Sequence, residues 1–167
     1  MRRLILTPLL LVVLVACSET RLPAAEQASF DPVAFFAGQT VGEGVLRVVL
    51  SKAVPIAVES RGTPQADGLM LRQTIREGDK PARMREWTIR KLGPGRYGGT
   101  LTDARGPVSM TVRGPRATIS YVMKNGMEVR QLLALQADER TVLNHLEVRK
   151  FGVRVAQLDE TIRKVDR

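Results

Sequence analysis

The fold class follows from residues 116–135, which read RATISYVMKNGMEVRQLLAL. Apolar and polar residues alternate on both sides of Asn125-Gly126, a dipeptide that suits the type I′ turn between twisted strands. Ala117, Ile119 and Tyr121 share one face, and the residues between them are polar. A period of two indicates strands with one buried face, so the stretch predicts an antiparallel hairpin.

The same alternation continues outward from this hairpin in both directions. From Gly42 onward, clusters of Gly, Pro, Asn and Asp interrupt it about every 8 to 14 residues, as expected of turns. Some 8 to 10 short strands would form a long meander, and closing it removes its two exposed edges. We therefore predict an all-β protein, an up-and-down antiparallel meander closed into a barrel. A β-sandwich is the alternative, because turn spacing alone does not define closure.

The two ends of this region follow other patterns. In the segment 30–38, Asp31 suits a helix cap and Pro32 the first helical position, so a short helical turn is expected. Its phenylalanines would plug one barrel end. In the segment 153–165, the spacing of the apolar residues favours a helix face over a strand.

The N-terminal residues predict where in the cell the protein is located. Arg2 and Arg3 precede an apolar stretch that is shorter than the roughly 20 residues a membrane helix needs, so it fits an export signal. The signal ends Leu-Val-Ala-Cys, which matches a lipobox, and Cys17 is the one cysteine of the chain. We expect lipidation at Cys17, with acyl chains such as palmitate. The expected division is a signal peptide at 1–16, a lipidated tether at 17–29 and a barrel domain at 30–167.

The net charge and the predicted location together limit the classes of binding partner. The chain has 26 basic and 17 acidic residues, a net charge of +9, and without Arg2 and Arg3 the value is +7. Ser18, in place of Asp, favours sorting to the periplasmic leaflet of the outer membrane. Behind a lipid anchor, a basic surface indicates anionic lipid head groups or a solvated barrel wall, and no nucleic acid.

Catalytic and metal chemistry have no support in the sequence. One cysteine and one histidine exclude a disulfide framework, a thiolate zinc cluster and a multi-histidine metal site. Gly42-Glu43-Gly44 lacks the following Lys-Ser or Lys-Thr of a phosphate loop, and its glycines suit a bent first strand. We predict no catalytic residue, no metal and no cofactor. An enzyme using a carboxylate at the barrel mouth is a third possibility without a motif.

Several motifs resemble a known family. They are FDPVAFFAG at 30–38, GEG at 42–44, REWTI at 85–89 and KFGVRVA at 150–156. Together they are similar to domain-of-unknown-function family 3833, and the resemblance covers about residues 29–164. It implies a bacterial lipoprotein with a lipocalin-like barrel, and it makes the last segment a strand. The family has no established activity, so no catalytic residue is carried over.

The inward faces define the expected ligand site. Arg85 shares the parity of Trp87 and Ile89, which places it at a barrel rim or inside, facing an anionic head group. We hypothesise binding of a small hydrophobic or amphipathic molecule such as a lipid, with Arg or Gln at the mouth. The alternative is a structural or interaction lipoprotein with a packed barrel; the oligomeric state is open. The expected lining residues are Leu71, Ile75, Arg85, Trp87, Ile89, Tyr97, Met110, Tyr121, Met123 and Leu133.

Overall fold

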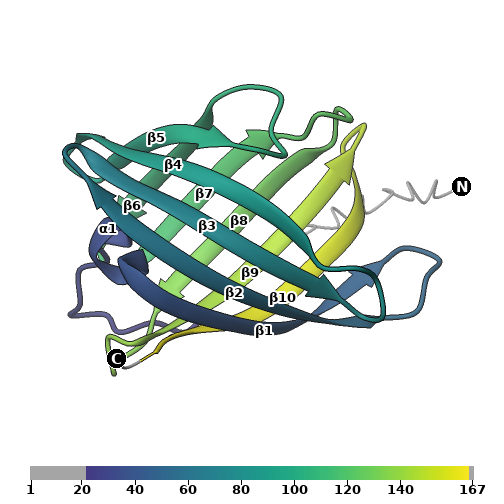
Figure 1. Ribbon diagram of the computed structural model, residues 1–167, viewed down its shortest axis with the longest axis horizontal. Helices are drawn as coiled ribbons and strands as arrows, with labels where there is room; N and C mark the ends of the chain where they lie inside the picture. Colours follow the sequence, from purple (N-terminus) through teal and green to yellow (C-terminus); the bar gives the residue numbers. More distant parts are fainter. Residues whose placement is uncertain (1–21, 166–167) are drawn as a thin grey trace, which may run out of the picture.

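A computed structural model describes residues 22–165, which form one closed antiparallel barrel (Figure 1). Each strand pairs with its neighbours along the chain, and the first strand pairs with the last to complete the ring. The predicted barrel is therefore confirmed, and the β-sandwich is not formed. The elements are helix α1 Pro32–Phe36 and strands β1 Gly38–Val48, β2 Val54–Gln65, β3 Gly68–Glu77, β4 Arg83–Gly93, β5 Arg96–Leu101, β6 Val108–Arg113, β7 Arg116–Val122, β8 Glu128–Leu135, β9 Thr141–Lys150 and β10 Val153–Lys164.

The barrel interior is built by the alternation seen in the sequence. In β7, Ala117, Ile119 and Tyr121 are buried, while the residues between them are half-buried or exposed. The same alternation in β3 turns Leu69 and Leu71 inward. Successive side chains of a strand point to opposite faces, so a closed sheet collects one apolar set inside.

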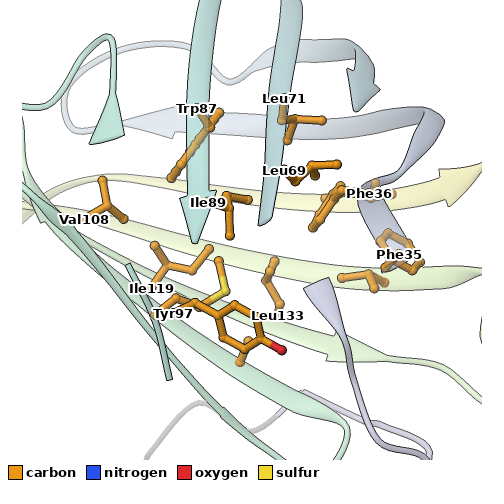
Figure 2. Close-up of a cluster of buried hydrophobic side chains, with 14 of the residues drawn as sticks. Phe35, Phe36, Leu69, Leu71, Trp87, Ile89, Tyr97, Val108, Ile119 and Leu133 are labelled. Carbon is orange, nitrogen blue, oxygen red and sulfur yellow. The ribbon is translucent and has the colours of Figure 1, made fainter. Parts of the chain in front are cut away.

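One end of the barrel, which we call the closed end, is plugged by α1 at the start of β1. Asp31 caps the helix by accepting hydrogen bonds from the amides of Val33 and Ala34 at 2.9 and 3.2 Å. Phe35 and Phe36 pack edge to face, with ring centroids 4.9 Å apart, within the buried cluster drawn in Figure 2. The predicted phenylalanine plug is therefore present.

The closed end also carries two other segments. Lys164 donates to the carbonyl oxygens of Ala34 and Phe35, both at 2.9 Å, so the end of β10 holds the end of α1. The described chain before α1 lies here too, since the amide of Ala25 donates to the carbonyl of Leu135 at 2.9 Å. The predicted signal peptide, Cys17 and the start of the tether lie outside residues 22–165.

The last segment is a strand, as the family resemblance implies, and the helical spacing misleads. β10 pairs with both β1 and β9, and its pairing with β9 shifts register between Arg154 and Ala156. Such a bulge adds one residue to a strand. It lets Val155 and Leu158, three residues apart, line the same cavity inside the barrel. The bulge therefore mimics a helical spacing.

The turn at Asn125-Gly126 differs from the predicted type I′ geometry. The amide of Met123 donates to the carbonyl of Met127 at 2.8 Å, so three residues form the loop. Only Gly126 among them has a positive φ, of 82°. A turn with positive φ at both central residues occurs instead at Phe151 and Gly152, with φ of 51° and 78°. Three-residue loops with a left-handed Gly are a common hairpin solution.

The tight closure between β1 and β10 explains the glycines of Gly42-Glu43-Gly44. A Cβ on Gly44 would overlap the carbonyl oxygen of Asp159, and a Cβ on Gly42 would overlap the carboxylate of Glu160. Gly44 therefore serves a close strand approach rather than only a bend, and Gly42 leaves room for the Glu160 side chain. Among residues 22–165, no helix has the length and apolar character to cross a membrane.

Candidate functional site

A cavity of about 460 Å³ occupies the half of the barrel away from α1. It is partly open, and it reaches the ends of β1 and β3 and the start of β4 at what we call the mouth. Its volume lies in the range of small-molecule sites, about 300–1,000 Å³. The lining residues are Leu46, Val48, Ile56, Val58, Ile75, Glu77, Arg83, Arg85, Asp103, Tyr121, Met123, Met127, Val129, Gln131, Asn144, Leu146, Val148, Val155, Ala156, Leu158 and Glu160.

The upper walls of this cavity are aliphatic. Ile56, Val58 and Ile75 form a buried cluster of their own, against which Leu46 and Leu158 pack. Val129 of β8 and Val148 of β9, with Met123 and Met127 of the loop between β7 and β8, line the cavity as well. In the closed half, the large aromatic rings of Phe, Trp and Tyr side chains fill the lumen (Figure 2). Near the mouth the side chains are smaller, so the same part of the lumen stays open.

A layer of polar side chains crosses the lumen beneath the aliphatic walls. We call it the polar layer and define it as Gln73, Arg85, Gln131, Asn144 and Glu160. All but Gln73 line both the large cavity and a second cavity of about 40 Å³ below it, and Gln73 lines the lower one. The layer is therefore the floor of the large cavity.

Gln73 organises one side of the polar layer. Its Oε1 accepts hydrogen bonds from Arg85 Nε and Trp87 Nε1, both at 2.8 Å. Its Nε2 donates to Ser60 Oγ at 2.9 Å. Both acceptor positions of the Gln73 oxygen and one of its two N–H donors are thus used, which fixes the position of the Arg85 side chain.

Glu160 and Asn144 form the other side of the layer. Asn144 Nδ2 donates to Glu160 Oε2 at 2.8 Å, and Gln131 Nε2 donates to Asn144 Oδ1 over a longer 3.4 Å. Burial raises the pKa of Glu160, against the opposing effects of the Asn144 hydrogen bond and the charge of Arg85. Gln131 Oε1 is buried and has no hydrogen-bond partner.

Arg85 differs from the arginines of the outer surface. Arg72 and Arg47 pair with Glu86 and Asp159 at 2.8 and 3.0 Å, but within residues 22–165 no carboxylate forms an ion pair with Arg85. Burial is the main cause that lowers the pKa of Arg85, although a guanidinium stays protonated near neutral pH. The floor of the cavity therefore presents a cation without a contacting anion.

The predicted lining residues divide between the two cavities. Ile75, Arg85, Tyr121 and Met123 line the large cavity. Tyr97 lines neither and belongs to the buried cluster of the closed half. The lower cavity has room for little more than water, so its residues are chiefly packing. The predicted residues that line only the lower cavity are Leu71, Trp87, Ile89, Met110 and Leu133.

The expected polar groups lie at two levels of the barrel. An Arg or Gln is predicted at the mouth, and Arg83 lies there, whereas Arg85, Gln73 and Gln131 lie at the cavity floor. Gln131, Asn144 and Glu160 were missed as lining residues. Their signal was a polar residue at an inward position, as Asn144 is between Val142 and Leu146.

The chain's histidine lies apart from this site. His145 is buried on the outer side of β9, and its Nδ1 lies 2.7 Å from Asp159 Oδ1. It does not line either cavity. Across the described part of the chain, no group of three or more His, Cys, Asp or Glu side chains is arranged to hold a metal ion.

The fold and the cavity define a closed antiparallel barrel protein with one internal, partly open site. The chain belongs to the family described as "Protein of unknown function (DUF3833)", whose model matches residues 11–164. The resemblance carried by the terminal motifs is thus confirmed at the level of the family.

The solved structures include a similar fold. A protein of unknown function from the DUF3598 family of Nostoc punctiforme matches with a TM-score of 0.64 and 15% sequence identity. The match covers 86% of this chain and 52% of that protein, so the chain spans about half of its length. No curated protein matches the chain.

Proposed function

We propose that this protein binds one small hydrophobic or amphipathic molecule inside the barrel, without catalysing a reaction. The observation that carries the proposal is the partly open cavity of about 460 Å³ with aliphatic upper walls. Transfer of an apolar chain from water to such walls is favourable. An apolar pocket with a small number of polar groups that point into it is typical of small-molecule sites.

The number of strands supports a lumen that side chains do not fill. Barrels of about eight strands are just wide enough for side chains or one small ligand, and diameter grows with strand number. This barrel has ten strands. The competing role, an interaction protein with a packed barrel, requires a filled lumen, and the cavity counts against it.

The proposal includes attachment to the periplasmic leaflet of the outer membrane through a lipid on Cys17. Its support is the lipobox in the sequence. The described chain nearest to Cys17 lies on the closed end, where Gln136 Nε2 donates to the carbonyl of Pro23 at 2.8 Å. Growth with labelled palmitate, comparing the native chain with Cys17→Ala, tests this part.

Ligand binding is tested with the full chain, kept in solution by digitonin, a steroid glycoside larger than the cavity. The probe is the uncharged fluorescent dye phenylnaphthylamine. Val58→Phe places a ring in the cavity, and Ala57→Phe places the same ring on the outer face of β2. We expect Val58→Phe to weaken dye binding by about tenfold or more and Ala57→Phe to leave it unchanged. Equal binding by all three chains, or none by the native chain, would overturn the proposal.

A further inference from the structure

We infer that the cavity selects amphiphiles with a carboxylate head and binds them head inward, with the carboxylate on Arg85 and the alkyl chain toward the mouth. This inference rests on the proposed function and names its ligand class.

Arg85 presents its guanidinium group to the large cavity. Its side chain lies on the floor of the large cavity, beneath aliphatic walls. Its Nε is held by Gln73, and its guanidinium carbon lies 5.5 Å from the centre of the Trp87 ring. Its two terminal nitrogens have no acceptor among residues 22–165. These nitrogens form the fork that binds a carboxylate through two parallel hydrogen bonds.

The charged side chains at the mouth of the cavity form ion pairs. At the mouth, Arg83 pairs with Asp103 at 3.0 Å and Glu77 pairs with Lys80. These pairs leave Arg85 and Glu160 as the charged groups of the floor.

Glu160 does not neutralise Arg85 by contact. Its carboxyl accepts from Asn144 at 2.8 Å and packs against Gly42, and it forms no ion pair with Arg85. Burial also raises the pKa of Glu160, which favours its neutral form. A buried cation without a paired anion is unfavourable, so an anionic guest stabilises the floor.

The polar layer also contains a hydrogen-bond acceptor without a partner. Gln131 Oε1 is buried without a hydrogen-bond partner, which is uncommon in folded proteins. Two groups of the layer thus lack a hydrogen-bond partner: the terminal nitrogens of Arg85 lack an acceptor, and Gln131 Oε1 lacks a donor. A carboxylate on Arg85, together with a water or a protonated group beside Gln131, completes both.

The charge of the site favours a carboxylate over a phosphate monoester. One guanidinium is uncompensated by contact, and a carboxylate brings one negative charge. A phosphate monoester brings about 1.5 to 2 negative charges near neutral pH. The lower cavity of about 40 Å³ leaves little room for a larger head. A single-chain carboxylate therefore matches both the charge and the space.

The test uses the full chain in the same bulky detergent, with dodecanoate, dodecanol and dodecyl phosphate as probes. Arg85→Gln removes the floor charge. Arg90→Gln is the matched control, because it removes the same charge on the exposed face of β4 and lines neither cavity. We expect Arg85→Gln to weaken dodecanoate binding by about tenfold or more and to leave dodecanol binding nearly unchanged. Arg90→Gln should affect neither probe strongly.

A second measurement gives the orientation without any substitution. Dodecanoate labelled at the carboxyl carbon or at the terminal methyl is bound to the native chain and observed by carbon NMR with a soluble paramagnetic agent. We expect a protected carboxyl and a more accessible methyl. A protected methyl with an accessible carboxyl would overturn the inference.

The outcomes separate this inference from the proposed function. If dodecanol binds as tightly as dodecanoate and Arg85→Gln changes neither, the cavity binds ligands but does not select their heads. If dodecyl phosphate binds more tightly than dodecanoate, the assignment to carboxylates is wrong. If no probe binds the native chain, the proposed function itself fails.

Discussion

Arg85 Nε donates a 2.8 Å hydrogen bond to Gln73 Oε1 inside the barrel, and that single oxygen also accepts from Trp87 Nε1. The relationship joins β3 to β4 beneath the cavity. It holds a cation at the floor while leaving the ends of its guanidinium without an acceptor. The amide of Gln73 therefore contacts both the packed core of the closed half, through Trp87, and the floor of the cavity, through Arg85.

We expect Gln73→Leu to destabilise the barrel. The change removes the acceptor of two buried donors, on Arg85 and Trp87, and the aliphatic side chain cannot replace it. A buried donor left unsatisfied costs about 1–3 kcal/mol, so we predict a loss of about 2 kcal/mol or more. Urea unfolding measures it, with Thr74→Val on the outer face of the same strand as the control. A loss no larger than that of Thr74→Val would contradict this account of Gln73.

Glu160 predicts a dependence of stability on pH. Burial raises its pKa in the folded barrel above the ordinary value of 4.5. A raised carboxyl pKa stabilises the fold at acidic pH, and this contribution is lost as pH rises through the folded pKa. Relative to Glu160→Gln, the native chain should therefore lose unfolding free energy as pH increases from about 4 to about 7. Glu43→Gln, exposed on β1, is the control. A difference that stays flat or reverses sign would show that burial does not govern Glu160.

The tip between β9 and β10 predicts a stabilising change. Phe151 is 94% exposed and has a φ of 51°, so it gains little burial and adopts a left-handed conformation that disfavours most side chains. Asn tolerates this conformation and suits the turn before Gly152. We expect Phe151→Asn to raise the unfolding free energy by about 1 kcal/mol in thermal unfolding. A clear loss of stability would mean that the exposed ring contributes more than the strain costs.

The pairing of β1 with β10, which closes the barrel and which we call the seam, predicts a substitution that strongly destabilises the fold. A methyl group added in Gly44→Ala would overlap the carbonyl oxygen of Asp159, which is backbone and cannot move aside cheaply. We expect a loss of at least about 2 kcal/mol, since the two strands close the barrel. Gly106→Ala is the control, because nothing lies within 4 Å of the added carbon. Equal effects of the two substitutions would argue against a tight seam.

The strands and their inward faces could be predicted because a period of two is local information. Ala117, Ile119 and Tyr121 are buried as their spacing indicates. Height along the barrel axis is not local, since it depends on strand tilt and on the register between neighbours. Leu71 and Ile75 share one face of β3, yet Leu71 lines the lower cavity and Ile75 the large one. The predicted lining therefore mixed core residues with true cavity residues.

Two further features needed the three-dimensional pairing. The bulge between Arg154 and Ala156 is invisible as a bulge in the sequence and gave a spacing typical of a helix. The polar layer joins residues of β3, β4, β8, β9 and β10, and no local pattern links Arg85 to Asn144 or Glu160. The resemblance to the family corrected the first feature, but it carried no information on the second.

The central claim is that the cavity near the mouth holds one amphiphile. Isothermal titration of the full chain with dodecanoate tests it most directly, with Val58→Phe measured beside the native chain. We predict one bound dodecanoate per native chain and an affinity weakened by about tenfold or more in Val58→Phe. Absence of saturable binding, or the same binding in Val58→Phe, would contradict the claim.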